Sequence, residues 1–106
     1  MLQSLLSKLA GAGPDKRSWE LIKQGARVID VRTPEEFGSG HLPQAINVPL
    51  SQISTWLIDQ DPKQSFVLYC AAGIRAQKAC DQLKCSGFPN VINAGSLKDL
   101  LSYQAT

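Results

Sequence analysis

Short apolar runs alternate with amphipathic stretches along most of this chain. The clearest run, residues 65–69 (SFVLY), has the length and composition of a strand that is buried on both faces. The same pattern predicts strands at residues 27–31, 45–48 and 90–93, and helical pieces at residues 19–23, 75–86 and from residue 96 onward. Strands that alternate with helices indicate βαβ units. We therefore predict an α/β fold with a small parallel sheet of four or five strands and helices on both of its faces.

Polar residues mark where several of the predicted helices begin. Thr33 is expected to cap a helix that starts with Pro34, and Glu36 closes a capping box with Thr33. Ser96 and Asp99 make a second capping box at the start of the last helix. Ser51 is expected to cap a further short helix. The apolar face of that helix consists of Ile53, Trp56 and Leu57.

The chain length of 106 residues fits a single domain. We divide the chain into an N-terminal extension, residues 1–13, and a domain at residues 14–106, with a hinge at residues 11–14 (GAGP). Helical spacing in the extension predicts either a short helix packed on the domain or a frayed end. The spaced residues are Leu2, Leu5, Leu6 and Leu9. The extension lacks the basic start and continuous apolar core of a secretion signal, so we expect it to stay uncleaved.

Composition and charge exclude several classes of partner. A net charge of +2 with scattered basic residues argues against nucleic acid and against an anionic membrane surface. No apolar run is long enough to span a bilayer. The three cysteines, Cys70, Cys80 and Cys85, form no CxxC pair and no even-numbered disulfide framework, so we expect no metal site and a reducing, cytoplasmic setting. No GxGxxG or P-loop motif is present, and we expect no cofactor.

One cysteine follows the strongest strand, at the place where ligands bind in parallel sheets. Cys70 ends the apolar run, and the small residues Ala71, Ala72 and Gly73 separate it from the helix that begins near Arg75. The backbone N–H groups of such a turn can converge on one anion, and the helix adds its positive dipole end. Together with the Arg75 guanidinium they favour a thiolate, which is the nucleophilic form of cysteine.

The alternative for Cys70 is a buried structural thiol, because free cysteine is among the most buried residue types. The single histidine, His41, is far from Cys70 in sequence, and we expect a structural, hydrogen-bonded imidazole rather than the base of a Cys–His hydrolase. The remaining cysteines lie on the helix at residues 75–86. Cys80 shares the apolar stripe with Ala76, Ala79 and Leu83, so it is predicted to lie in the core. Cys85 lies on the polar face near the far end of the helix, and we expect it to be an exposed bystander.

Three blocks of the chain resemble the rhodanese domain, in the order that the family has them. They are residues 28–37 (VIDVRTPEEF), residues 40–49 (GHLPQAINVP) and residues 70–75 (CAAGIR), which is similar to the family's CxxGxR active-site loop. A fourth stretch, residues 93–97 (NAGSL), lies where the family has a glycine pair before its last helix. The resemblance covers most of residues 18–101.

The resemblance implies a thiosulfate sulfurtransferase with a rhodanese-like fold. The loop cysteine of that family takes a sulfane sulfur from a donor such as thiosulfate, becomes a persulfide, and passes the sulfur to cyanide or another thiophilic acceptor, which in a relay can be a protein. By position, Cys70 would be the persulfide carrier. The backbone of Ala71, Ala72, Gly73, Ile74, Arg75 and Ala76 would hold the terminal sulfur, with Arg75 bracing the loop. Asp30 and Arg32 would line or support the same pocket, or else form only an ion pair at the strand end.

Two alternatives stay open beside this enzyme. The uncharged loop residues Ala71, Ala72 and Ile74 favour a non-catalytic sulfur carrier or binding module over a site for dianionic thiosulfate. A Cys-dependent phosphatase is disfavoured, because related phosphatases have one more residue in the loop than the four between Cys70 and Arg75. Tyr69 also replaces the histidine that precedes their cysteine. Two further departures from the family are Ser96 in place of a glycine and the early end of the chain after Tyr103.

Overall fold

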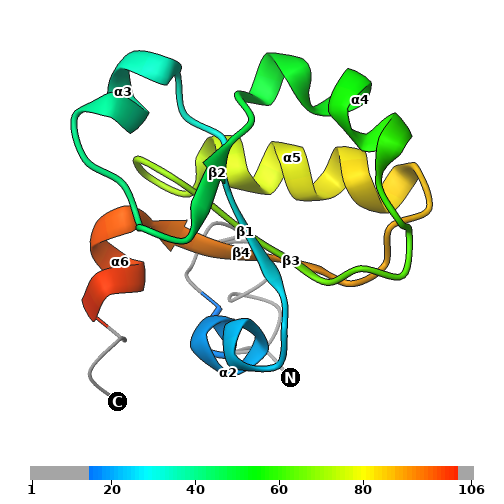
Figure 1. The fold of residues 1–106 in the computed structure, drawn as a ribbon, viewed down its shortest axis with the longest axis horizontal. Coiled ribbons are helices and arrows are strands. Elements are labelled where there is room, and N and C mark those ends of the chain that lie inside the picture. The colour runs from blue at the N-terminus through cyan, green and yellow to red at the C-terminus, as the bar shows by residue number, and fades with distance from the viewer. Residues whose placement is uncertain (1–14, 103–106) are drawn as a thin grey trace, which may run out of the picture.

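The computed structural model of the chain describes residues 15–102. Within them, four parallel strands form one sheet in the order β2-β1-β3-β4 (Figure 1). The strands are β1 (Arg27–Asp30), β2 (Ala45–Asn47), β3 (Phe66–Cys70) and β4 (Val91–Ser96). The predicted α/β fold with a small parallel sheet is confirmed.

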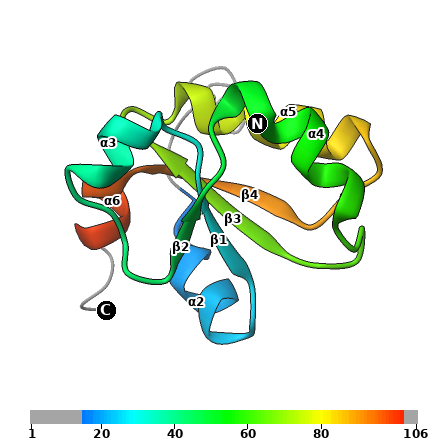
Figure 2. The same cartoon turned by 45° about the horizontal axis from the view of Figure 1, so that its top comes forward.

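Helices cover both faces of the sheet, as predicted (Figures 1 and 2). On one face lie α5 (Ile74–Cys85) and α4 (Ile53–Trp56), the latter between the 3-10 turns η1 (Leu50–Gln52) and η2 (Leu57–Asp59). On the other face lie α2 (Ser18–Lys23) and α6 (Leu97–Ser102). The short helix α3 (Pro34–Gly38) follows the carboxyl end of β1. No helix within residues 15–102 is long and apolar enough to cross a bilayer.

The central strand β3 separates two apolar clusters. Phe66, Leu68 and Cys70 point to the cluster under α4 and α5. Val67 and Tyr69 alternate with them and point to the cluster with α2 and α6. Every residue of β3 is at most 1% exposed, which confirms the strand predicted to be buried on both faces. The predicted stripe of α5 is buried as well, and it consists of Ala76, Ala79, Cys80 and Leu83.

Both capping boxes are present. At the start of α3, the Glu36 N–H donates to Thr33 Oγ1 while the Thr33 N–H donates to Glu36 Oε1. At the start of α6, the Asp99 N–H donates to Ser96 Oγ and the Ser96 N–H donates to Asp99 Oδ2. These reciprocal bonds satisfy N–H groups that a helix start otherwise leaves without partners.

The predicted cap at Ser51 is wrong. Ser51 lies inside η1, and the residue before α4 is Gln52, whose side chain makes no capping bond. The chain turns helical directly after Pro49, where the Gln52 N–H donates to the Pro49 carbonyl and closes a 3-10 turn. The Leu50 N–H donates to the Val31 carbonyl at the end of β1. Ser51 therefore never occupies the non-helical position that a cap needs. The apolar face of this segment is nevertheless as expected, with Ile53 buried and Trp56 and Leu57 packed against the core.

The last strand is longer than its prediction. β4 continues to Ser96, beyond the expected end at Asn93, and its pairing with β3 shifts on the way. Leu68 is paired with Asn93, but Cys70 is paired with Ser96, so β4 holds one extra residue between these pairs. Gly95, with φ of 87°, takes up the bend. The helix predicted in residues 1–13 lies outside the described residues.

Candidate active site

The structure places Cys70 at the carboxyl end of β3, directly before the turn that starts α5. Ala71 and Ala72 are exposed, whereas Cys70 is 1% exposed. Gly73 precedes the first residue of α5 and has φ of 90°, a conformation that side chains other than hydrogen disfavour. The turn between β3 and α5, residues 71–73, can therefore adopt this backbone conformation because its third residue is glycine.

Two backbone N–H groups of the loop donate to the sulfur of Cys70. The Gly73 N–H lies 2.9 Å from Sγ and the Ala76 N–H lies 3.4 Å from it. Of the six residues, 71–76, whose backbone the resemblance implies would hold the terminal sulfur, these two donate hydrogen bonds to Sγ itself among the described residues. Both donors belong to the start of the twelve-residue helix α5, whose dipole is positive at this end. The arrangement stabilises negative charge on sulfur.

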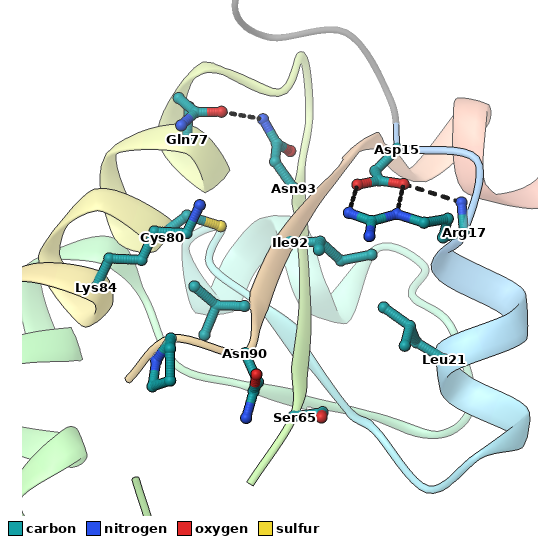
Figure 3. Close-up of a pocket in the computed structure, with 12 residues that line it drawn as sticks. Asp15, Arg17, Leu21, Ser65, Gln77, Cys80, Lys84, Asn90, Ile92 and Asn93 are labelled. Atoms are coloured by element: carbon teal, nitrogen blue, oxygen red, sulfur yellow. Dashed lines mark hydrogen bonds and ion pairs between the residues drawn. The ribbon is translucent and has the colours of Figure 1, made fainter. Parts of the chain in front are cut away.

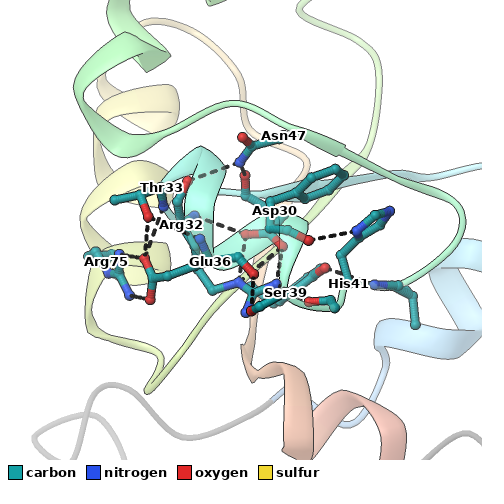
Figure 4. Close-up of polar contacts among 12 residues, drawn as sticks. Asp30, Arg32, Thr33, Glu36, Ser39, His41, Asn47 and Arg75 are labelled. Carbon is teal, nitrogen blue, oxygen red and sulfur yellow. Dashed lines mark hydrogen bonds and ion pairs between the residues drawn. The ribbon is translucent and has the colours of Figure 1, made fainter.

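Arg75 is held by a carboxylate from a different loop. Its Nη1 and Nη2 donate to Oε1 and Oε2 of Glu36 at 2.7 and 2.9 Å (Figure 4). The Arg75 guanidinium, with the Thr33 N–H, lowers the pKa of Glu36 to about 2, and the carboxylate raises the pKa of Arg75. Glu36 therefore has two tasks, because it also closes the capping box of α3. The cap is predictable from residues 33–36, whereas opposite charge is the only sign in the sequence of the ion pair with Arg75.

Asp30 and Arg32 pair with each other at the end of β1. Arg32 Nη2 donates to Asp30 Oδ2 at 2.7 Å and also to the Gly40 carbonyl at 2.7 Å, and the Arg32 N–H donates to Asp30 Oδ1 at 2.9 Å (Figure 4). The hydrogen bonds to Asp30 raise the pKa of Arg32. Asp30 is fully buried and Arg32 nearly so, which makes this a buried strand-end pair rather than a surface one. Within residues 15–102 neither side chain has a hydrogen bond to Cys70, and their hydrogen bonds join the end of β1 to the Gly40 carbonyl.

Tyr69 connects this pair to the loop that carries His41. Its hydroxyl accepts a hydrogen bond from the Leu42 N–H at 3.1 Å, and the Arg32 guanidinium lies 5.6 Å from the centre of its ring. Burial raises the pKa of Tyr69 to about 12. The His41 ring stacks on Phe37 at 3.6 Å between centroids, and its Nδ1 lies 2.8 Å from the Phe37 carbonyl oxygen. The expected structural, hydrogen-bonded histidine is therefore present.

Comparison with known proteins identifies the family. The protein-family model described as "Rhodanese-like domain" matches residues 16–100. The chain belongs to the rhodanese-like family. It is 36% identical over 74 residues to the thiosulfate sulfurtransferase PspE of Escherichia coli K12, covering 68% of this chain and 71% of that protein. It is 31% identical over 78 residues to the thiosulfate sulfurtransferase GlpE of Pseudomonas syringae, covering 74% of each.

A solved structure agrees with these relatives. The structure titled "rhodanese with anions from E. coli" superimposes with a TM-score of 0.65 at 35% identity, covering 71% of this chain and 91% of that one. The resemblance read from the motifs is thus confirmed, and the protein is a rhodanese-type sulfurtransferase with a sulfur donor and a sulfur acceptor as its partners.

A cavity among the described residues lies away from Cys70. It has a volume of about 720 Å³ and runs along β4 between α2 and α5, where Asp15 and Arg17 form an ion pair (Figure 3). Its one cysteine, Cys80, is 1% exposed, and burial raises the pKa of this thiol to about 12. A sulfur atom needs a small ring of N–H donors rather than a large cavity, so the Cys70 loop remains the candidate site.

The predicted positions of the other two cysteines, one in the core and one exposed, are confirmed. All three cysteines are free. Cys80 is buried in the cluster under α5, and Cys85 is exposed at the last residue of the helix. Among residues 15–102, no group of three or more metal-ligating side chains is placed to hold an ion.

Proposed function

We propose that Cys70 carries the transferred sulfur as a persulfide. The observation that carries this proposal is the pair of N–H groups, from Gly73 and Ala76, that donate to Sγ at the start of α5. These donors favour the thiolate as nucleophile. They also suit a persulfide anion, whose negative charge is one bond further out, and the proposal assigns its outer sulfur to the backbone N–H groups of residues 71–76.

The reaction consists of two displacements at sulfur. The Cys70 thiolate attacks the outer sulfur of thiosulfate, a sulfur–sulfur bond forms, and sulfite leaves with the electron pair of the broken bond. Cyanide or another thiophile then attacks the outer sulfur of the persulfide. Thiocyanate leaves in the case of cyanide, and the Cys70 thiolate is restored. No proton transfer is required in either step, which is consistent with a chain whose single histidine, His41, is engaged with Phe37.

The ionic residues around the loop act as supports. Arg75 braces the first turn of α5 through Glu36, since the bidentate pair fixes the guanidinium. Asp30 and Arg32 hold the end of β1 and the Gly40 carbonyl next to it. We place this chemistry in a reducing compartment such as the cytoplasm, with the three free cysteines as support.

A sulfur-carrier role is a second candidate, and the charge at the loop favours it. Arg75 and Arg32 are both paired with carboxylates, while Ile74 is 60% exposed at the start of α5. A loop rim with paired cations and apolar side chains attracts dianionic thiosulfate weakly. It suits a monoanionic thiol persulfide better, including one on a partner protein.

Sulfur loading tests both candidates. The purified protein is incubated with thiosulfate, its intact mass is measured, the modified residue is mapped, and cyanide is added. We expect one added sulfur on Cys70, absent from Cys70→Ser, that cyanide releases as thiocyanate. Loading from a thiol persulfide but not from thiosulfate would identify the carrier. Loading of Cys70 from neither donor would overturn the proposed persulfide.

A further inference from the structure

Asn93 of β4 has hydrogen bonds to three groups near the active-site loop. Its Nδ2 donates to the Gly73 carbonyl at 2.9 Å and to Gln77 Oε1 at 3.2 Å, and its Oδ1 accepts from the Gly95 N–H at 2.8 Å. Figure 3 shows the side chains of Asn93 and Gln77 facing each other between β4 and α5. Asn93 is 8% exposed, so these contacts are made almost entirely out of water.

Gly73 connects Asn93 to the Cys70 sulfur through two hydrogen bonds. Gly73 donates its N–H to Cys70 Sγ, and its own carbonyl accepts from both Asn93 Nδ2 and the Gln77 N–H. It occupies the position before α5 with a positive φ, and no side chain caps the helix there. Glycine is the residue with the most backbone freedom, so its orientation has to be fixed by its surroundings.

The irregular pairing of β4 is what brings Asn93 into place. The extra residue of β4 lies between the pairs Leu68–Asn93 and Cys70–Ser96, and the Gly95 N–H at this bend is bound by Asn93 Oδ1. One end of the carboxamide therefore holds the bend in β4 while the other end holds the loop. Ser96, where the family has a glycine, caps α6 instead, because its Oγ accepts from the Asp99 N–H.

We propose that Asn93 is a positioning residue for Cys70. By holding the Gly73 carbonyl, it keeps the Gly73 N–H directed at the sulfur and so sets the reactivity of the thiolate. The inference rests on the proposed function in that Cys70 is the nucleophile whose reactivity matters. It concerns the same loop, but it is tested without any sulfur donor.

The test measures how the alkylation rate of Cys70 by iodoacetamide depends on pH, with the labelled residue mapped by mass spectrometry. In Asn93→Ala, the Gly73 carbonyl loses its side-chain donor and keeps the Gln77 N–H. We expect the pH midpoint of Cys70 alkylation to rise by about one unit, which corresponds to one hydrogen bond to a charged group. Gln77→Ala is the matched control. It removes the other side-chain partner of Asn93 but leaves the Asn93–Gly73 hydrogen bond. The pH midpoint of Cys70 alkylation should therefore stay at the wild-type value in this variant.

A second pair of variants covers the case in which Asn93→Ala does not fold. Asn93→Asp keeps the shape and the acceptor for Gly95 but has no N–H for the Gly73 carbonyl. Gln77→Glu brings a carboxylate to the neighbouring position and keeps the Asn93–Gly73 bond, so it measures the effect of charge alone. We expect the pH midpoint of Cys70 alkylation to rise more in Asn93→Asp than in Gln77→Glu. Equal shifts in these two variants would overturn the proposal, and so would an Asn93→Ala protein with a lowered melting temperature and an unchanged midpoint.

The alkylation test of Asn93 and the sulfur-loading test of Cys70 can fail independently of each other. If the wild-type protein takes up no sulfur on Cys70 while Asn93→Ala shifts alkylation, the persulfide fails and the positioning role holds. If sulfur loads on Cys70 and the alkylation midpoint is unmoved in Asn93→Ala, the persulfide holds and the positioning role fails.

Discussion

Glu36 binds Arg75 through both of its carboxylate oxygens, at 2.7 and 2.9 Å, although the two residues are 39 positions apart. The pair connects α3, which follows β1, to the first turn of α5, which follows β3. Two loops at the carboxyl edge of the sheet are thereby joined beside Cys70. The contact also removes the free positive charge that the sequence pattern suggests for this loop.

The stability of this connection should depend on pH through Glu36. Its pKa is lowered from 4.5 to about 2 in the folded protein, so the pair contributes stability above pH 4.5 and loses it as the pH falls toward 2. We expect the melting temperature of wild type to exceed that of Glu36→Gln at neutral pH, with the gap closing between pH 4.5 and 2. Glu35→Gln, on the same turn and exposed, is the control and should show no such gap. A gap of constant size down to pH 2 would contradict the assignment.

Restoring a free cation to the loop should improve the use of thiosulfate. Ile74 is 60% exposed at the start of α5, so Ile74→Arg places an unpaired guanidinium beside the Cys70 loop. We expect kcat/KM for thiosulfate to rise by about two- to tenfold at low ionic strength, and the gain to fade as salt screens the charge. Ile58→Arg adds the same charge in η2, at the opposite end of α5 from the loop (Figures 1 and 2), and should change nothing. Equal rates in the two variants would show that loop charge does not limit the reaction.

Cys80 and Cys85, the two cysteines of α5, should differ in reactivity, and their substitutions should differ in their effect on the stability of the protein. Cys85 is exposed, whereas Cys80 is 1% exposed with a pKa raised by burial to about 12. At pH 8 iodoacetamide should label Cys85 and leave Cys80 unlabelled until the protein is unfolded. Cys80→Ser places a hydroxyl in the core and should lower the free energy of unfolding by about 1–3 kcal/mol. Cys85→Ser should change it by less than about 0.5 kcal/mol. Peptide mapping and urea denaturation would check both, and labelling of folded Cys80 at pH 8 would contradict the raised pKa of its thiol.

The order of the helices and strands and the position of Cys70 could be predicted, because both depend on residues that are close together in the sequence. Apolar runs and capping residues mark strands and helix starts, and a cysteine after the most buried strand must lie at the carboxyl edge of a parallel sheet. Ser51 shows the limit of this reasoning. A polar residue before an apolar stripe is a cap only if the chain is still extended there, and the hydrogen bond from the Gln52 N–H to the Pro49 carbonyl makes it helical earlier.

The contacts that hold the active-site loop could not be predicted in the same way. Glu36 reaches Arg75 and Asn93 reaches Gly73 across loops that come together only once the sheet is assembled. Each of these residues also has a local role that its sequence context explains, as a helix cap or as part of a strand. The helix cap accounts for the glutamate at position 36, so opposite charge is the only sign of its contact with Arg75. No pattern in the sequence relates Asn93 to Gly73.

Tyr69 provides a test of the buried network under the loop. Its hydroxyl is the hydrogen-bond partner of the buried Leu42 N–H at 3.1 Å, and Tyr69→Phe leaves that N–H without an acceptor inside the core. A buried polar group without a partner costs about 1–3 kcal/mol, so urea denaturation should show a loss of that size in the free energy of unfolding. Because the hydroxyl has no hydrogen bond to Cys70 among residues 15–102, sulfur loading of the folded variant should stay at the wild-type level. A variant as stable as wild type would mean that the Leu42 N–H finds another partner, and a stable variant that fails to load would place Tyr69 in the sulfur site itself.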